Sequence, residues 1–182
     1  DAGLHQFDAY MAVNNERRSF MLVDVIEEEF AVDKVPALNL RDRKALMLRR
    51  SQRKFSRTPY RLSVYQGKST RGSGEAAVVH CAISNNELVD PWLQVMLRHE
   101  VPLAGIYSVP LMGPDLMARI KKTRQPVLLL TQHHGEKLRQ VFMQNGFVQS
   151  ARLSQSPALD DDDYPQFVLT ELMDLWGVTV QG

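Results

Sequence analysis

The stretch VLLLTQHHGEKLRQVFMQNGFVQSARL, residues 127–153, decides the fold because it encodes three consecutive strands. Its start, Val127–Thr131, is a short apolar run of the kind that forms buried strands. Lys137–Met143 and Phe147–Leu153 alternate apolar and polar residues, which is typical of half-buried strands. Asn145-Gly146 stands between them, and this dipeptide is the strongest short signal for a two-residue β-hairpin. We therefore predict one strand followed by an antiparallel hairpin.

Helix and strand patterns alternate on both sides of this stretch. Apolar residues at helical spacing predict helices over residues 3–13, 39–55, about 85–100, 115–121 and 164–176, with Gly177 ending the last. Strand patterns cover residues 19–25, 30–35, 60–66, 76–83 and 103–109, and the third and fourth of these should pair as a hairpin around the loop 67–74. The order of elements predicts a mixed α/β fold.

The run KKTRQP, residues 121–126, marks a change of composition between the two halves of this pattern. We predict a first lobe over residues 1–122, which includes an inserted α/β subdomain, and the start of a second lobe over residues 123–182. The chain begins at Asp1 within a helical pattern. We therefore expect both lobes to be incomplete in this sequence.

Composition excludes few classes of function. Hydrophobic residues make up 44% and charged residues 24% of 182 residues, which is ordinary globular usage. The formal net charge of +1 gives no argument for nucleic acid or membrane binding. The single cysteine, Cys81, cannot form an intrachain disulfide, which suits a reducing compartment. Because Cys81 lies in the apolar run Ala76–Ile83, we expect it to be a small buried hydrophobe.

No complete set of catalytic or metal-binding residues is visible in the sequence. His133-His134 has no second His or Cys pair at the spacing that zinc sites use. Gly67-Lys68-Ser69-Thr70 resembles the end of a phosphate-binding loop, but Leu62 stands where that loop needs its first glycine. No nucleophile elbow is present, and Asp160–Asp163 is interpreted as a solvated acidic segment. We expect no cofactor, no metal and no enzymatic activity.

A cluster of cations over residues 41–57 is the most distinctive charge feature. It faces only one acid, Asp42, and could bind phosphates or anionic lipid headgroups. The alternative is a solvated helix face that pairs with the acidic turn Glu27–Glu29 or with Asp160–Asp163. We predict a possible anionic-surface patch formed by Arg43, Lys44, Arg49, Arg50, Arg53, Lys54 and Arg57. Aromatic residues for stacking on bases are sparse nearby, so we expect no nucleic-acid partner.

Several phrases resemble one family of proteins. These phrases are VPAL at 35–38 with RDRKAL at 41–46, TPYR at 58–61, VPLAGIYSVPL at 101–111, and the hairpin within 127–153. Together with the order of elements they resemble the actin-like (ribonuclease-H-like) cytoplasmic domains of bacterial pilus and type II secretion assembly platforms, the group of PilM, GspL and MshI. The resemblance covers residues 19–155 and is closest to uncharacterised proteobacterial relatives of that group.

The resemblance implies a fold and a setting, but it carries no ATP site. In actin-like ATPases the turn after the first strand of a lobe is rich in Gly, Asp and small hydroxyl residues that hold nucleotide phosphates. The corresponding turn here, Thr131–Glu136, has one glycine, no aspartate and two histidines. We therefore expect a non-catalytic cytoplasmic scaffold, on the cytoplasmic side of the inner membrane, that binds protein partners of an envelope-associated assembly. The alternatives are an actin-like ATP-binding protein whose nucleotide site lies partly outside this chain, and a nucleic-acid-binding module.

Overall fold

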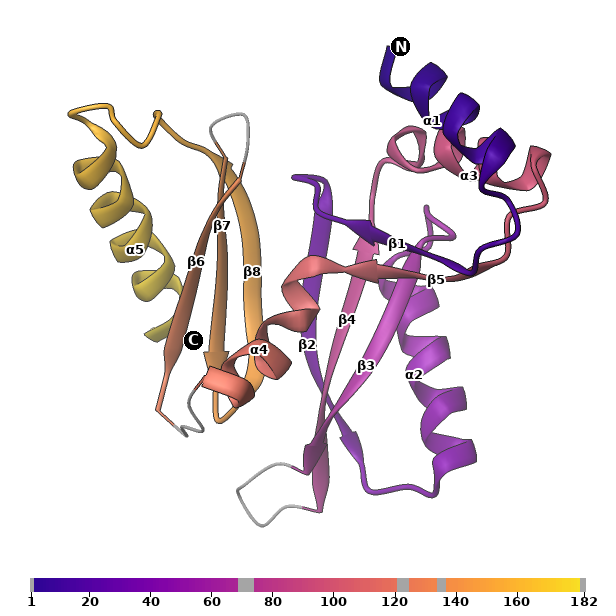
Figure 1. Cartoon of the computed structure of the whole chain (residues 1–182). Coiled ribbons are helices and arrows are strands. Elements are labelled where there is room, and N and C mark those ends of the chain that lie inside the picture. Colours follow the sequence, from indigo (N-terminus) through magenta and orange to yellow (C-terminus); the bar gives the residue numbers. More distant parts are fainter. Residues whose placement is uncertain (1, 69–73, 121–124, 134–136, 181–182) are drawn as a thin grey trace.

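The computed structural model describes residues 2–68, 74–120, 125–133 and 137–180 and contains three small sheets (Figure 1). The first sheet has the order β2-β4-β3, formed by Glu28–Pro36, Glu75–Ile83 and Arg61–Lys68, and all its pairings are antiparallel. The helix α2, Leu40–Lys54, packs on one face of this sheet through Met47. Asn39 caps α2 because its side chain accepts a hydrogen bond from the Asp42 amide.

A second sheet joins segments that are far apart in sequence. The strand β1, Ser19–Val23, pairs in parallel with β5, Leu103–Ser108, so the whole β2–α2–β3–β4 unit is inserted between two partner strands. The helices α1, Ala2–Val13, and α3, Asp90–Arg98, cover one face of this sheet, with the short helix η1, Asn86–Leu88, leading into α3. This face is apolar because Met21 and Val23 point toward the helices.

The third sheet contains residues 127–153, the stretch that predicts three consecutive strands. Its order is β6-β7-β8, formed by Val127–His133, Lys137–Gln144 and Phe147–Gln155, and both pairings are antiparallel. Its β7–β8 turn, Asn145-Gly146, has φ angles of 55° and 77°, as the predicted hairpin requires. The helix α5, Tyr164–Val180, covers one face, and η2, Val109–Met112, with α4, Gly113–Ile120, packs against the other (Figure 1).

Three sequence predictions are wrong in this fold. Glu28 does not belong to a solvated turn: it starts β2 and is 7% exposed. Gly177 does not end the last helix, which continues to Val180, because a single glycine inside a helix costs only about 1 kcal/mol. The spacing of Leu40, Leu46 and Met47 in the sequence predicts one apolar, buried side for α2, but Leu40 is 58% exposed. The division at residues 122–123 stays a prediction, because it falls in a segment outside the described residues.

Candidate functional site

An apolar groove of about 280 Å³ lies where two of the sheets meet. The start of β3 and the end of β4 form one side, and the end of β5 with Val23 of β1 forms the other. Both β3 and β5 are edge strands within the sheets that the structure describes. We call this the inter-sheet groove, and its apolar lining comes from Val23, Pro59, Tyr60, Leu62, Cys81, Ala82, Ile83, Ile106 and Tyr107.

Two buried polar groups also line the inter-sheet groove. The Glu28 side chain is 1% exposed and Ser108 is 8% exposed. Neither the Glu28 Oε2 atom nor the Ser108 hydroxyl has a hydrogen-bond partner among the described residues. Burial raises the pKa of Glu28 to about 7, although the positive charge of Arg139 acts against this rise. The groove therefore combines apolar walls with a carboxyl group that can be neutral or charged near pH 7.

Arg139 holds the region behind this carboxyl group together. It comes from β7 of the third sheet, is 1% exposed, and forms an ion pair with Asp24, which follows β1. It also donates a hydrogen bond of 3.1 Å to the Val25 carbonyl, and its Nη2 atom lies 3.9 Å from Glu28 Oε2. One guanidinium thus joins the third sheet to the link between β1 and β2, directly beside the groove.

Cys81 lies in the wall of the inter-sheet groove as a small apolar residue. It is 4% exposed, which confirms the prediction from its apolar strand. Burial, and then the nearby Glu28 carboxylate, raises the pKa of the Cys81 thiol to about 12. Because the thiolate is the nucleophilic form, this cysteine is unsuited to covalent chemistry.

A Ser–His–Asp cluster on the β2-β4-β3 sheet is structural. The Ser63 hydroxyl lies 2.7 Å from His80 Nδ1, and His80 Nε2 lies 3.4 Å from an Asp33 carboxylate oxygen. His80 is 0% exposed, and burial lowers its pKa although Asp33 acts to raise it. A fully buried imidazole gives a substrate no access, so these residues cannot perform the nucleophilic catalysis that a triad requires.

In the structure, two residues of the predicted cation patch contact the β2-β4-β3 sheet and the other five are exposed. Arg43 lies 3.8 Å from the centre of the Tyr65 ring, and Arg50 pairs with Asp33 at 2.9 Å and donates to the Lys34 carbonyl. Both side chains thereby fasten α2 to its sheet. The other predicted members, Lys44, Arg49, Arg53, Lys54 and Arg57, are exposed. Among the described residues, the acid that pairs with this helix is Asp33 of β2, and not the turn Glu27–Glu29.

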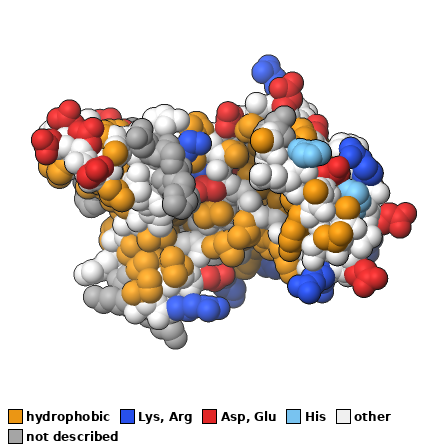
Figure 2. All heavy atoms as spheres, turned by 45° about the horizontal axis from the view of Figure 1, so that its top comes forward, with side chains coloured by type: hydrophobic (Ala, Val, Ile, Leu, Met, Phe, Trp, Pro, Cys, Tyr) orange, Lys and Arg blue, Asp and Glu red, His pale blue; other side chains and the backbone are white. Residues whose placement is uncertain are grey.

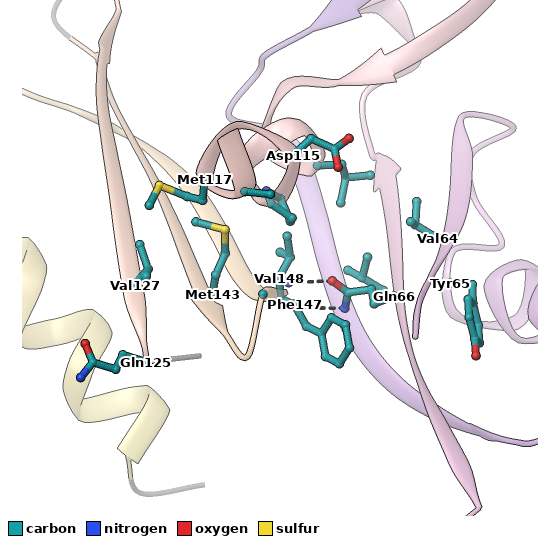
Figure 3. Close-up of a pocket in the computed structure, with 15 residues that line it drawn as sticks. Val64, Tyr65, Gln66, Asp115, Met117, Gln125, Val127, Met143, Phe147 and Val148 are labelled. Carbon is teal, nitrogen blue, oxygen red and sulfur yellow. Dashed lines mark hydrogen bonds between the residues drawn. The ribbon is translucent and has the colours of Figure 1, made fainter. Parts of the chain in front are cut away.

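A larger cavity of about 570 Å³ lies between the β2-β4-β3 sheet and the β7–β8 hairpin, beside α4 (Figure 3). Gln66 of β3 spans it: its amide accepts a hydrogen bond of 2.6 Å from the Val148 amide and donates one of 3.0 Å to the Val148 carbonyl. Phe147 comes within 3.1 Å of the position that a side chain at Gly67 would occupy. These contacts couple the two sheets, and Asp115 at the cavity is exposed.

No group of three or more His, Cys, Asp or Glu side chains is placed to hold a metal ion in the part of the chain that the structure describes. Two sequence candidates cannot be located in full: residues 134–136 of the Thr131–Glu136 turn and residues 69–73 of the loop after Lys68 lie outside the described residues. Asp160–Asp163 is exposed and precedes α5, and acidic side chains gather at the left end of Figure 2, over this loop.

Sequence reasoning missed the polar residues of the groove, namely Glu28, Ser108 and Arg139. The only available signal was Arg139 itself, since a cation stands inside Leu138–Met143, a strand that is buried on both faces. A buried arginine needs an acid partner. The sequence gives no indication that this partner is Asp24, 115 residues earlier.

Comparison with known proteins supports the fold. No protein-family model and no curated protein matches the chain. Among solved structures, a chain of the PilM–PilN type IV pilus biogenesis complex matches with a TM-score of 0.55 and 14% identity over 85% of this chain. A protein with an actin-like ATPase fold and unknown function from Bacteroides thetaiotaomicron matches with a TM-score of 0.40 and 8% identity over 86% of this chain. The chain spans 48% and 55% of these structures, respectively. The structure confirms the predicted mixed α/β fold class, and its fold is similar to that of the chain from the PilM–PilN complex.

Proposed function

We propose that this chain is an actin-like scaffold domain of an envelope-associated assembly of the type IV pilus or type II secretion kind, and that it binds a partner protein without catalysis. The observation that carries the proposal is the inter-sheet groove, which offers apolar walls between two edge strands. The likeness in fold to a chain of the PilM–PilN complex supports the setting.

The chemistry of the groove favours a polypeptide segment as the occupant. Leu62 and Tyr107 are 42% and 43% exposed, so both present apolar surface that a bound side chain could cover. Edge strands recognise extended segments through backbone hydrogen bonds, while adjacent pockets select the side chains. A PilN-like subunit of the same assembly is the partner that we propose, acting on the cytoplasmic side of the inner membrane.

The absence of catalysis is part of the proposal and has its own support. The buried Ser63–His80–Asp33 cluster is closed to substrates, and burial holds the Cys81 thiol in its protonated form. The helices within the described residues include none long and apolar enough to cross a membrane.

Co-purification of the 182-residue chain with a PilN-like subunit of its own organism tests the groove. Leu62→Glu and Tyr107→Glu should each weaken the complex at least tenfold, because a carboxylate would lie against the partner's apolar side chains. Val32→Glu is the matched control, since Val32 is 38% exposed on β2, away from the groove. Equal binding by all three variants would refute the groove as the docking site.

Titration with Mg-ATP tests the alternative of an actin-like ATP-binding protein. We expect no heat of binding, because no phosphate-binding turn is evident in the sequence. A dissociation constant below about 100 μM, equivalent to about 5.5 kcal/mol, would instead favour a nucleotide-dependent scaffold.

A further inference from the structure

The outward side of α2 carries two adjacent rows of exposed residues. Residues four apart lie above one another on a helix, so positions 40, 44, 48 and 52 form one row and positions 41, 45, 49 and 53 form the next. All eight are exposed. They comprise Leu40, Arg41, Lys44, Ala45, Leu48, Arg49, Gln52 and Arg53, which together define the outer face of α2.

The outer face of α2 has four cations, and one exposed acid, Asp42, lies beside them. Asp42 lies outside both rows, but it stands seven residues before Arg49 and therefore on the same side of the helix, where it accepts a hydrogen bond of 2.7 Å from the Asn39 side chain. The two cations that are engaged within the protein, Arg43 and Arg50, also lie outside the rows. The structure therefore separates the cations that fasten α2 from those that face outward.

Two exposed leucines accompany these cations: Leu48 lies within the outer face, and Leu40 lies at its edge, seven residues before the buried Met47. Leu40 is 58% exposed and Leu48 is 55% exposed, although both belong to a helix that buries other apolar residues against the sheet. The N-terminal part of the outer face thus has leucines beside Arg41, Lys44 and Arg49. Such an arrangement suits a helix that lies in the plane of a membrane interface, with leucines among the headgroups and cations on their phosphates.

We propose that the outer face of α2 docks onto an anionic lipid bilayer, with Arg41, Lys44, Arg49 and Arg53 binding headgroups and with Leu40 and Leu48 inserted between them. An anionic bilayer matches both features, since its surface supplies negative charge and an apolar layer beneath it. Nucleic acid would match the charge alone: Tyr65 is covered by Arg43 and lies on the opposite side of α2. The proposal is independent of the inter-sheet groove.

Vesicle co-sedimentation of the 182-residue chain tests this proposal. The chain should bind vesicles of phosphatidylcholine with about 30% phosphatidylglycerol and not vesicles of phosphatidylcholine alone, and about 0.5 M salt should release it. Arg41→Gln/Arg49→Gln/Arg53→Gln should lower the partition coefficient about 100-fold, at about fivefold per cation. Leu40→Ser/Leu48→Ser should lower it about tenfold at unchanged charge.

The matched control is Arg17→Gln/Arg18→Gln/Arg119→Gln, which removes three exposed cations outside α2. It changes the net charge as much as the α2 triple variant and should bind vesicles within about twofold of the original chain. Three results would overturn the proposal: equal losses in both triple variants, unchanged binding by the leucine variant, or tighter binding to an oligonucleotide than to the anionic vesicles. Unfolding midpoints within about 2 °C of one another would establish that all variants are folded.

Discussion

Replacing Arg139 with methionine removes the buried cation that joins the third sheet to the link between β1 and β2. Methionine keeps most of the apolar stem, so the change mainly deletes the ion pair with Asp24 and the hydrogen bond to the Val25 carbonyl. Removal of one member of a buried ion pair costs about 3–5 kcal/mol. Because Glu28 has a pKa of about 7 and can take up a proton, we expect the lower end, about 3 kcal/mol.

Urea and thermal unfolding at pH 7, followed by circular dichroism, measure this loss. For a chain of this length, about 3 kcal/mol corresponds to a fall of about 6–12 °C in Tm. Arg139→Met/Asp24→Asn should recover part of the stability, since the Asp24 carboxylate no longer remains buried without its cation. Arg119→Met is the control at an exposed arginine and should change stability by less than about 0.5 kcal/mol. Equal midpoints for Arg139→Met and Arg119→Met would refute the reasoning.

Three further predictions follow from the same contacts. The raised pKa of Glu28 adds stability that is complete below pH 4.5 and is lost as pH rises through 7. The free energy of unfolding of Glu28→Gln should therefore rise relative to that of the original chain, by up to about 3 kcal/mol, as pH rises from about 4.5 to above 7. Parallel pH dependences of the two chains would contradict this. Cys81, whose pKa is about 12, should resist iodoacetamide at pH 8 until the chain is unfolded in urea, and modification of the folded chain would show that the thiol is accessible. Gly146→Ala should lower stability by about 1 kcal/mol in urea unfolding, because φ is 77° there, and a neutral result would mean that the turn can relax.

The predictions that succeeded rest on signals contained within a few residues. Asn145-Gly146 specifies a tight turn because both residues tolerate positive φ, and the structure has both angles positive. Asn39 was expected at the start of the basic helix, and its side chain caps that helix. The strands on either side of residues 67–74 pair as the alternating pattern predicts. In each case the physical cause is local.

The candidate site depends on contacts that no local pattern records. Three consecutive acids usually mark solvent, but Glu28 pairs in the sheet with Ile83 and lies near Arg139. The groove itself requires the parallel pairing of β1 with β5, two strands separated by a complete inserted unit. Arg43 and Arg50 differ from the exposed cations of α2 because they contact Tyr65 and Asp33, which lie on two different strands. Such long-range partners become visible only in the folded chain.

Hydrogen–deuterium exchange of the chain with and without a PilN-like subunit tests the central claim most directly. Partner binding in the inter-sheet groove predicts slower exchange at the start of β3 and at the end of β5, with unchanged exchange in α5 and in the β6–β8 sheet. The account would be contradicted if saturating partner left both groove strands unprotected, or if protection were confined to the third sheet.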